Sequence, residues 1–194
     1  MNTAPALTPR EVAELSGTPR RLVEKAIEER VLSARFGSSP TMKRRVRRML
    51  PTYSVVYAAA VGRLGLKLSI AHKKELARAI AERPRAKRVK VALAVEIDIG
   101  RLVGNAFERT EKYRAARDAF IVVDGEIKGG TPVIRGTRMT VYALLGRIEH
   151  GESMEDILSD NPDLTREAIE AAIIYARTHP LVGRPGGRPW ADRR

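Results

Sequence analysis

The sequence predicts an α+β fold that is mainly helical. Most segments carry apolar residues at the three-and-four spacing of a helix that buries one side. Short glycine- and proline-punctuated segments, and one stretch in which apolar and polar residues alternate, predict a few strands among these helices. At roughly 100 to 200 residues per domain, a chain of 194 residues forms one large domain or two to three small ones.

Basic residues outnumber acidic ones, and the excess lies in the first half of the chain. Lys and Arg number 36 and Asp and Glu 23, which gives a net charge of +13. Residues 1–50 hold 11 basic and 5 acidic side chains and residues 51–88 hold 9 and 2, whereas residues 120–176 hold 5 and 10. This asymmetry indicates a polyanionic partner for the N-terminal half and another role for the acidic segment.

Several classes of protein are excluded by composition. The chain has no cysteine, which excludes disulfides, thiolate nucleophiles and cysteine-based zinc sites. Its apolar runs, such as residues 55–61, are far shorter than the ~20 residues of a membrane span, and its first residues lack the pattern of a secretory signal. We therefore expect no membrane partner and a cytoplasmic location.

Residues 1–85 are predicted to form a winged helix-turn-helix followed by two further helices. Thr8 and Glu11 make a predicted capping box at the start of the first helix, with a proline at its first position. Gly17 ends this helix, and Thr18 is expected to cap the next one, so stop and restart lie within about three residues. This is the spacing of a helix-turn-helix.

A hairpin, the wing, is expected within residues 31–50. The turn sequence Gly37-Ser38-Ser39-Pro40 lies there between short apolar stretches and is followed by a basic strand or turn. Residues 51–64 and 69–82 are then predicted to be helices, the second capped by Ser69.

We expect the wing and the start of the second helix to bind operator DNA, because Arg can fork onto guanine and helix N-termini favour phosphate. The predicted DNA-binding residues are Thr18, Arg20, Arg21, Lys25, Arg35, Lys43, Arg44, Arg45, Arg47 and Arg48. The alternative is a basic run that is merely a solvated face. Five like charges within residues 43–48 repel one another unless an anion is near, which favours DNA.

Residues 86–123 are predicted to form a strand-helix-strand element. Apolar and polar residues alternate over residues 89–99, which predicts a strand, and a helix around residues 102–113 and a second strand at 120–123 follow. A strand edge that is not covered must be paired, so we expect this element to form a homodimer. Pairing of the edge with the wing of the same chain is the alternative.

Residues 124–179 carry a glycine-punctuated arm and three helices, predicted over residues 141–150, 153–159 and 165–178. The arm contains the ordered residues Gly130, Pro132, Ile134, Arg135, Gly136, Thr137 and Arg138. With the helices that follow, this stretch resembles the domain of unknown function family numbered 433, which implies a homeodomain-like helical domain with an extended arm.

The resemblance also implies a function. The family's context is the antitoxin half of VapBC-like toxin-antitoxin pairs, whose partner is a PIN-like ribonuclease toxin. Residues 7–32 in turn resemble the MerR-type winged helix, although the exposed face of the second helix includes Glu24, Glu28 and Glu29.

Residues 180–194 are predicted to be a flexible basic tail, because their prolines and glycines disfavour regular structure. A floppy tail without a role is one reading, and binding of the toxin is the other. In the second reading arginines reach the acidic metal site of the ribonuclease and the tryptophan fills a pocket. The predicted toxin-binding residues are Arg184, Arg188, Trp190, Arg193 and Arg194. The acidic segment 120–176 is the alternative toxin contact.

No catalytic, metal-binding or cofactor-binding set is predicted. The histidines at positions 72, 150 and 179 are isolated in sequence, the Gly129-Gly130 pair lacks a phosphate-loop Lys-Ser or Lys-Thr, and the aspartates at 156, 160 and 163 suit helix caps and loops. We therefore expect an autorepressing antitoxin and not an enzyme. A stand-alone transcription regulator is the alternative, and a nucleic-acid-processing enzyme is a weaker third.

Overall fold

The structure, a computed structural model, describes residues 6–39, 42–93 and 95–181. The helices are α1 (Pro9–Ser16), α2 (Arg20–Glu28), α3 (Tyr53–Arg63), α4 (Ile70–Glu82), α5 (Ile99–Val103), α6 (Ala106–Phe120), α7 (Val141–Glu149), α8 (Met154–Asp160) and α9 (Arg166–Thr178). The strands are β1 (Arg35–Ser39), β2 (Met42–Met49), β3 (Arg88–Ala92), β4 (Val95–Asp98), β5 (Ile121–Val122) and β6 (Val133–Ile134).

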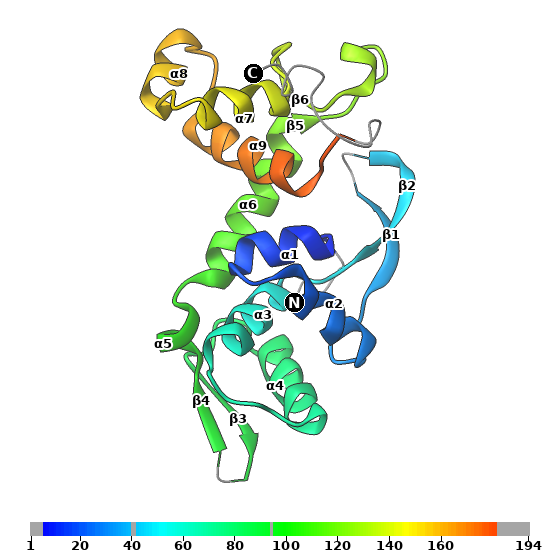
Figure 1. Cartoon of the computed structure of the whole chain (residues 1–194), viewed down its shortest axis with the longest axis vertical. Coiled ribbons are helices and arrows are strands. Elements are labelled where there is room, and N and C mark those ends of the chain that lie inside the picture. The colour runs from blue at the N-terminus through cyan, green and yellow to red at the C-terminus, as the bar shows by residue number, and fades with distance from the viewer. Residues whose placement is uncertain (1–5, 40–41, 94, 182–194) are drawn as a thin grey trace, which may run out of the picture.

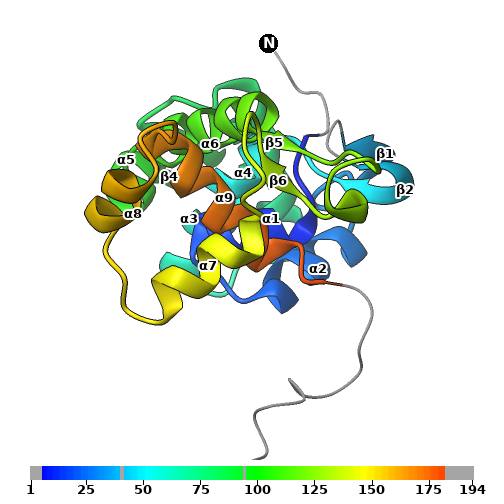
Figure 2. The same cartoon turned by 90° about the horizontal axis from the view of Figure 1, so that it is seen from above.

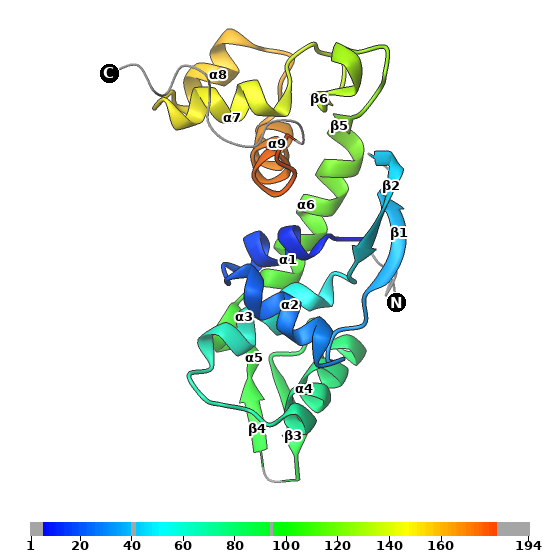
Figure 3. The same cartoon turned by 45° about the vertical axis from the view of Figure 1, so that its right-hand side comes forward.

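The predicted fold class, α+β and mainly helical, is confirmed. Within the described ranges the strands pair only as β1–β2, β3–β4 and β5–β6, each pair antiparallel. Figure 1 shows two groups of helices, α1–α4 and α7–α9, with α6 running between them. The β3–β4 hairpin lies at the end of the molecule far from α7–α9 (Figures 1 and 3).

Helix α1 begins at the predicted capping box. The Glu11 N–H donates to the Thr8 hydroxyl at 3.2 Å, and the Glu11 carboxylate accepts from the Thr8 N–H at 2.6 Å. Gly17 ends the helix with a φ of 66°, a left-handed conformation that glycine adopts without steric cost. Helix α2 starts three residues later, so the predicted stop and restart are confirmed.

Thr18 does not cap α2, so that part of the prediction is wrong. The N-cap residue is Pro19, and no side chain caps this helix. The Thr18 Oγ1 lies 2.7 Å from the Ser16 Oγ, and a Cβ added at Gly62 of α3 would lie 2.6 Å from the Thr18 Cγ2. Close packing of the turn on α3 therefore directs Thr18 away from the α2 amides.

The predicted hairpin within residues 31–50 is present as β1 and β2. The sequence places its turn at residues 37–40, but Gly37 still pairs with Arg47, and Ser39 with Met42. The register shifts between Gly37 and Ser39. Such an irregularity lets a strand continue through a residue that otherwise favours a turn. The two helices that follow match their predictions, and Ser69 caps α4 by accepting from the His72 N–H at 3.2 Å.

The single strand predicted over residues 89–99 is instead the β3–β4 hairpin, and α5 begins at Ile99. Val89, Val91 and Ile97 are all buried, so the alternating pattern continues across the reversal and conceals it. The open edge of β3 is therefore paired by the next segment of the chain and not by the wing. Leu93, at the reversal, is fully exposed.

The C-terminal segment follows its predicted outline. The strand predicted at residues 120–123 is β5, which pairs with β6 of the arm. Thr140, Ser153 and Thr165 accept from backbone N–H groups at the starts of α7, α8 and α9, the boundaries that the caps predict.

One continuous core joins the two groups of helices. Helix α6 packs against α9, α3 and α1, and α9 packs against α7 and α1. Seen from above, the β1–β2 hairpin lies on the opposite side of the molecule from α8 (Figure 2). No helix in the described part of the chain is long and apolar enough to cross a membrane.

Candidate nucleic-acid interface

Helix α2 exposes the basic residues that the sequence predicts at its start. It buries Val23 and Ala26, which leaves Arg20, Arg21 and Lys25 exposed on its outer side. Thr18, the remaining predicted contact in this region, is half-buried in the turn between α1 and α2. The exposed cations thus occupy the first turns of α2, where the N-terminal amides also carry partial positive charge.

Glu24 joins α2 to the hairpin. Its Oε1 accepts from the Arg20 Nη2 at 2.8 Å, and its Oε2 accepts from the Arg48 Nη2 of β2 at 2.7 Å. One carboxylate therefore fixes a helix and a strand 24 residues apart in a single arrangement. This role was not predicted from the sequence, where Glu24 is only an acidic exception on the exposed basic face of the second helix.

A second acidic residue, Glu29 at the C-terminal cap of α2, is also ion-paired. Glu29 Oε2 accepts from the Lys73 Nζ of α4 at 2.7 Å, and Lys25 lies 3.9 Å from its other oxygen. The Glu29 side chain is 16% exposed in this arrangement. Glu28, in contrast, is exposed, as the sequence predicts.

The hairpin brings the remaining predicted DNA contacts onto adjacent strands. Arg35 lies on β1 opposite Met49 and is exposed, and Phe36 lies opposite Arg48. The other basic residues of the wing all lie in β2: Lys43, Arg44, Arg45 and Arg47. The strand thus holds five basic residues beside a helix that exposes three.

The predicted toxin-binding residues of the tail lie outside the described residues. They are Arg184, Arg188, Trp190, Arg193 and Arg194.

A buried polar cluster connects α1 with α6 and α9. Glu11 is 0% exposed and Arg117 of α6 is 1% exposed. Glu11 Oε1 accepts from the Arg117 Nη1 and from the Tyr113 hydroxyl, each at 2.8 Å. Arg117 also donates to the carbonyl of Ala6 at 2.9 Å and to the Asp118 carboxylate. The residue that completes the cap of α1 therefore also attaches this helix to α6.

The charges of the cluster support one another. Burial opposes ionisation of Glu11, but Arg117, His179 and the Thr8 N–H together hold the pKa of this carboxyl below its usual value. Burial and the neighbouring Glu11 raise the pKa of Tyr113 well above its usual value. Glu11 is thus a buried anion and Tyr113 a neutral donor to it. No local pattern in the sequence points to this pairing, since 106 residues separate Glu11 from Arg117.

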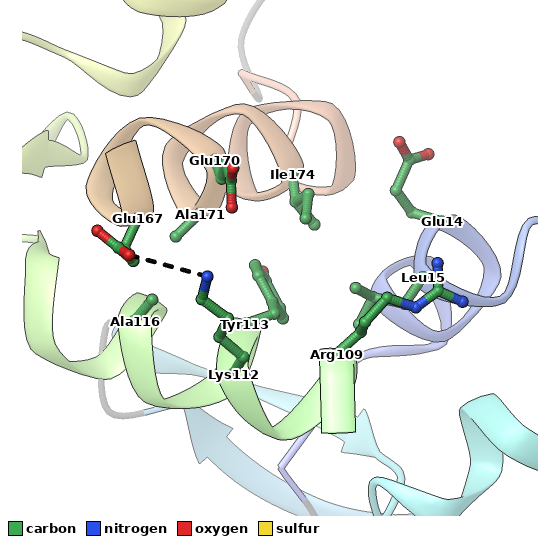
Figure 4. Close-up of a pocket in the computed structure, with 10 residues that line it drawn as sticks. All are labelled: Glu14, Leu15, Arg109, Lys112, Tyr113, Ala116, Glu167, Glu170, Ala171 and Ile174. Carbon is green, nitrogen blue, oxygen red and sulfur yellow. Dashed lines mark ion pairs between the residues drawn. The ribbon is translucent and has the colours of Figure 1, made fainter. Parts of the chain in front are cut away.

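A groove of about 400 Å³ lies beside this cluster, between α1, α6 and α9 (Figure 4). Its apolar lining includes Leu15, Ala116 and Ile174. Lys112 of α6 lies 3.8 Å from Glu167 of α9 across it. One cation of α6 thus faces an acid of α9. The described residues include no group of three or more histidine, aspartate or glutamate side chains that could hold a metal ion.

A family model matches part of the C-terminal segment. Residues 121–176 match the family described as a protein of unknown function (DUF433), which confirms the resemblance predicted there. The uncharacterized protein y4eO of Sinorhizobium fredii is 41% identical over 88 residues, a stretch that covers 45% of this chain and 39% of that relative.

A solved structure, the X-ray crystal structure of Rv2018 from Mycobacterium tuberculosis, is similar over 88% of this chain and 97% of its own, with 13% sequence identity and a TM-score of 0.34. The family match itself spans the segment from β5 to α9, which is the part of this chain that is similar to DUF433.

Proposed function

We propose that this chain is a DNA-binding antitoxin of a VapBC-like toxin-antitoxin pair, which neutralises a PIN-like ribonuclease and represses its own operon. The observation that carries the DNA-binding half is the attachment of Arg48 in β2 to Glu24 in α2 at 2.7 Å. It attaches the exposed basic start of α2 to the β1–β2 hairpin, and this supports an arrangement with a helix in the major groove and a wing beside it. The predicted contacts are then Arg20, Arg21 and Lys25 with the wing.

The antitoxin half comes from the resemblance of residues 121–176 to their family and from the acidic charge of this segment. Its toxin contact is proposed to be the tail, with the acidic segment as the alternative. Glu167 and Glu170 of α9 line the groove beside α6 and would offer carboxylates to a basic partner there.

Salt-dependent binding of duplex DNA tests the DNA-binding half. Each phosphate contact by Lys or Arg releases counterions, so we expect affinity to fall steeply with salt, and Arg44→Glu/Arg45→Glu to weaken binding to all sequences and to flatten this dependence. The matched control is Lys87→Glu/Lys90→Glu, which makes the same change of charge at two exposed positions around β3. Fluorescence anisotropy with a labelled duplex of mixed sequence measures both. Affinity that is independent of salt, or equal losses in the two double variants, would refute the interface.

A stand-alone transcription regulator is the second candidate, because the basic α2–hairpin surface serves it equally well. The two functions differ in one observation, namely whether the adjacent reading frame encodes a PIN-like ribonuclease that this chain inhibits. An antitoxin inhibits ribonuclease activity when the two purified proteins are mixed, whereas a stand-alone regulator leaves it unchanged.

A further inference from the structure

Phe36 on β1 is exposed to an extent unusual for an aromatic side chain. It is 77% exposed, whereas Phe107 and Phe120 are half-buried against the core. A large apolar side chain in water forgoes the free energy that its burial provides. One exposed apolar residue needs no explanation by itself, so its surroundings decide whether Phe36 has a role.

The hairpin register places Phe36 on the same face as Arg48, which is ion-paired with α2. Phe36 is the direct cross-strand partner of Arg48, and directly opposed residues in an antiparallel pair lie on the same face. Arg48 on that face reaches Glu24 of α2 at 2.7 Å. The ring therefore belongs to the face of the hairpin that, together with α2, forms the basic surface.

All charged residues in the segment that contains Phe36 are basic. Residues 31–50 contain no acidic residue and six basic ones: Arg35, Lys43, Arg44, Arg45, Arg47 and Arg48. Its neighbour Arg35 is exposed as well. The partner that fits is a polyanion with an apolar surface between its charges, and the deoxyribose and base edges of a DNA groove provide this surface.

We propose that Phe36 is an apolar DNA contact, packing in the minor groove that adjoins the major groove entered by α2 while Arg35 binds the flanking phosphates. This inference rests on the proposed DNA binding and adds a contact that is independent of charge. An anionic membrane surface also attracts an apolar and basic hairpin. The neighbouring helix-turn-helix favours DNA, since α2 adds Arg20, Arg21 and Lys25 and no further exposed apolar residue.

The salt dependence of binding distinguishes an apolar contact from an ionic one. Phe36→Ala in the full chain is expected to weaken binding of a labelled mixed-sequence duplex about tenfold, which lies at the lower end for burial of such a side chain. The slope of affinity against salt is expected to be unchanged, because no counterion is released by a phenyl ring. Arg35→Gln is expected to reduce this slope, and Phe36→Trp to retain most of the affinity.

The control variant is Leu66→Ala, which truncates a side chain that is 69% exposed in the loop between α3 and α4. Its affinity and slope should equal those of the wild type, and thermal unfolding should be the same for all variants. If the wild type binds with the expected salt dependence and Phe36→Ala binds like Leu66→Ala, the Phe36 contact is refuted and the DNA-binding function stands. If the wild type shows no salt-dependent binding, both are refuted. If Phe36→Ala loses binding to phosphatidylserine vesicles and binds DNA as the wild type does, the DNA contact of Phe36 is refuted and the side chain contacts a membrane surface instead.

Discussion

Removal of the Arg117 guanidinium should destabilise the whole chain. In Arg117→Met, Glu11 keeps the Thr8 N–H and the Tyr113 hydroxyl as donors and His179 as a charged neighbour, and it loses the guanidinium bonded to it in a site that is 0% exposed. Breaking a buried ion pair from one side costs about 3–5 kcal/mol, and we expect the upper part of this range. For Glu11→Gln we expect the lower part, because Arg117 retains the Asp118 carboxylate at 2.8 Å.

Thermal and urea unfolding measure this cost. At this chain length about 1 kcal/mol corresponds to roughly 2–4 °C in Tm, so a loss of about 3–5 kcal/mol lowers Tm by about 6–20 °C. The matched control is Arg114→Met, three residues earlier on α6, where the ion pair with Glu111 is 27% exposed on both sides. A pair of this kind contributes about 0–1 kcal/mol.

The double variant Glu11→Gln/Arg117→Met tests whether the two charges act on each other. The double variant removes both charges, so no unpaired charge of this pair remains buried. Its loss of unfolding free energy should therefore be clearly smaller than the sum of the losses in the two single variants. A cost that equals the sum, or an Arg117→Met protein as stable as Arg114→Met, would refute the role of the cluster.

The pH dependence gives a second readout of the same cluster. Because the pKa of Glu11 is lower in the folded chain than in the unfolded one, its contribution to stability is present above the unfolded pKa and is lost as pH falls through the folded pKa. In Glu11→Gln this contribution to acid unfolding should be absent.

Two further changes test the assembly and the tail. The homodimer that the sequence predicts remains to be tested, and Leu93 is fully exposed at the β3–β4 reversal. If that exposed apolar side chain contributes to the dimer, Leu93→Lys should give a monomer in sedimentation without a loss of stability, whereas Leu66→Lys should leave the dimer intact. A wild type that is monomeric at micromolar concentration would contradict the homodimer. Truncation after Leu181 should preserve DNA binding and weaken inhibition of the ribonuclease, and equal inhibition by the full and truncated chains would assign the contact to residues 120–176 instead. The cut lies beyond His179 because its carbonyl accepts from the Tyr142 hydroxyl at 2.5 Å, and a carboxylate there would add a charge close to the buried cluster.

Local signals in the sequence predict most helices correctly. The capping box at Thr8, the caps at Ser69, Ser153 and Thr165, and the left-handed Gly17 are decided by residues within one helical turn, so the sequence displays them directly. The β3–β4 reversal escaped prediction because Leu93 and the residue after it carry no turn signal, and both strands bury the same face.

The basic residues of the candidate interface can be predicted from the sequence, but the ion pairs that connect its elements cannot. The sequence displays the basic residues of α2 and the hairpin, but an isolated Glu24 gives no sign that it connects Arg20 with Arg48. The same holds for Glu11, whose place in a capping box explains it completely at the level of the sequence. Contacts between distant segments depend on the assembled core, to which no local pattern refers.

The double use of Glu11 has a consequence for the order in which the chain acquires its structure during synthesis. The carboxylate is made with the first turn of α1, but its partners Tyr113 and Arg117 are 102 and 106 residues further on. Until α6 has left the ribosome, Glu11 can only cap its own helix and face water. Helix α1 is therefore fixed in place late, and a nascent chain of α1–α4 alone lacks the contacts with α6 that hold it. Premature termination before Arg117 would leave α1 with its cap and without its attachment.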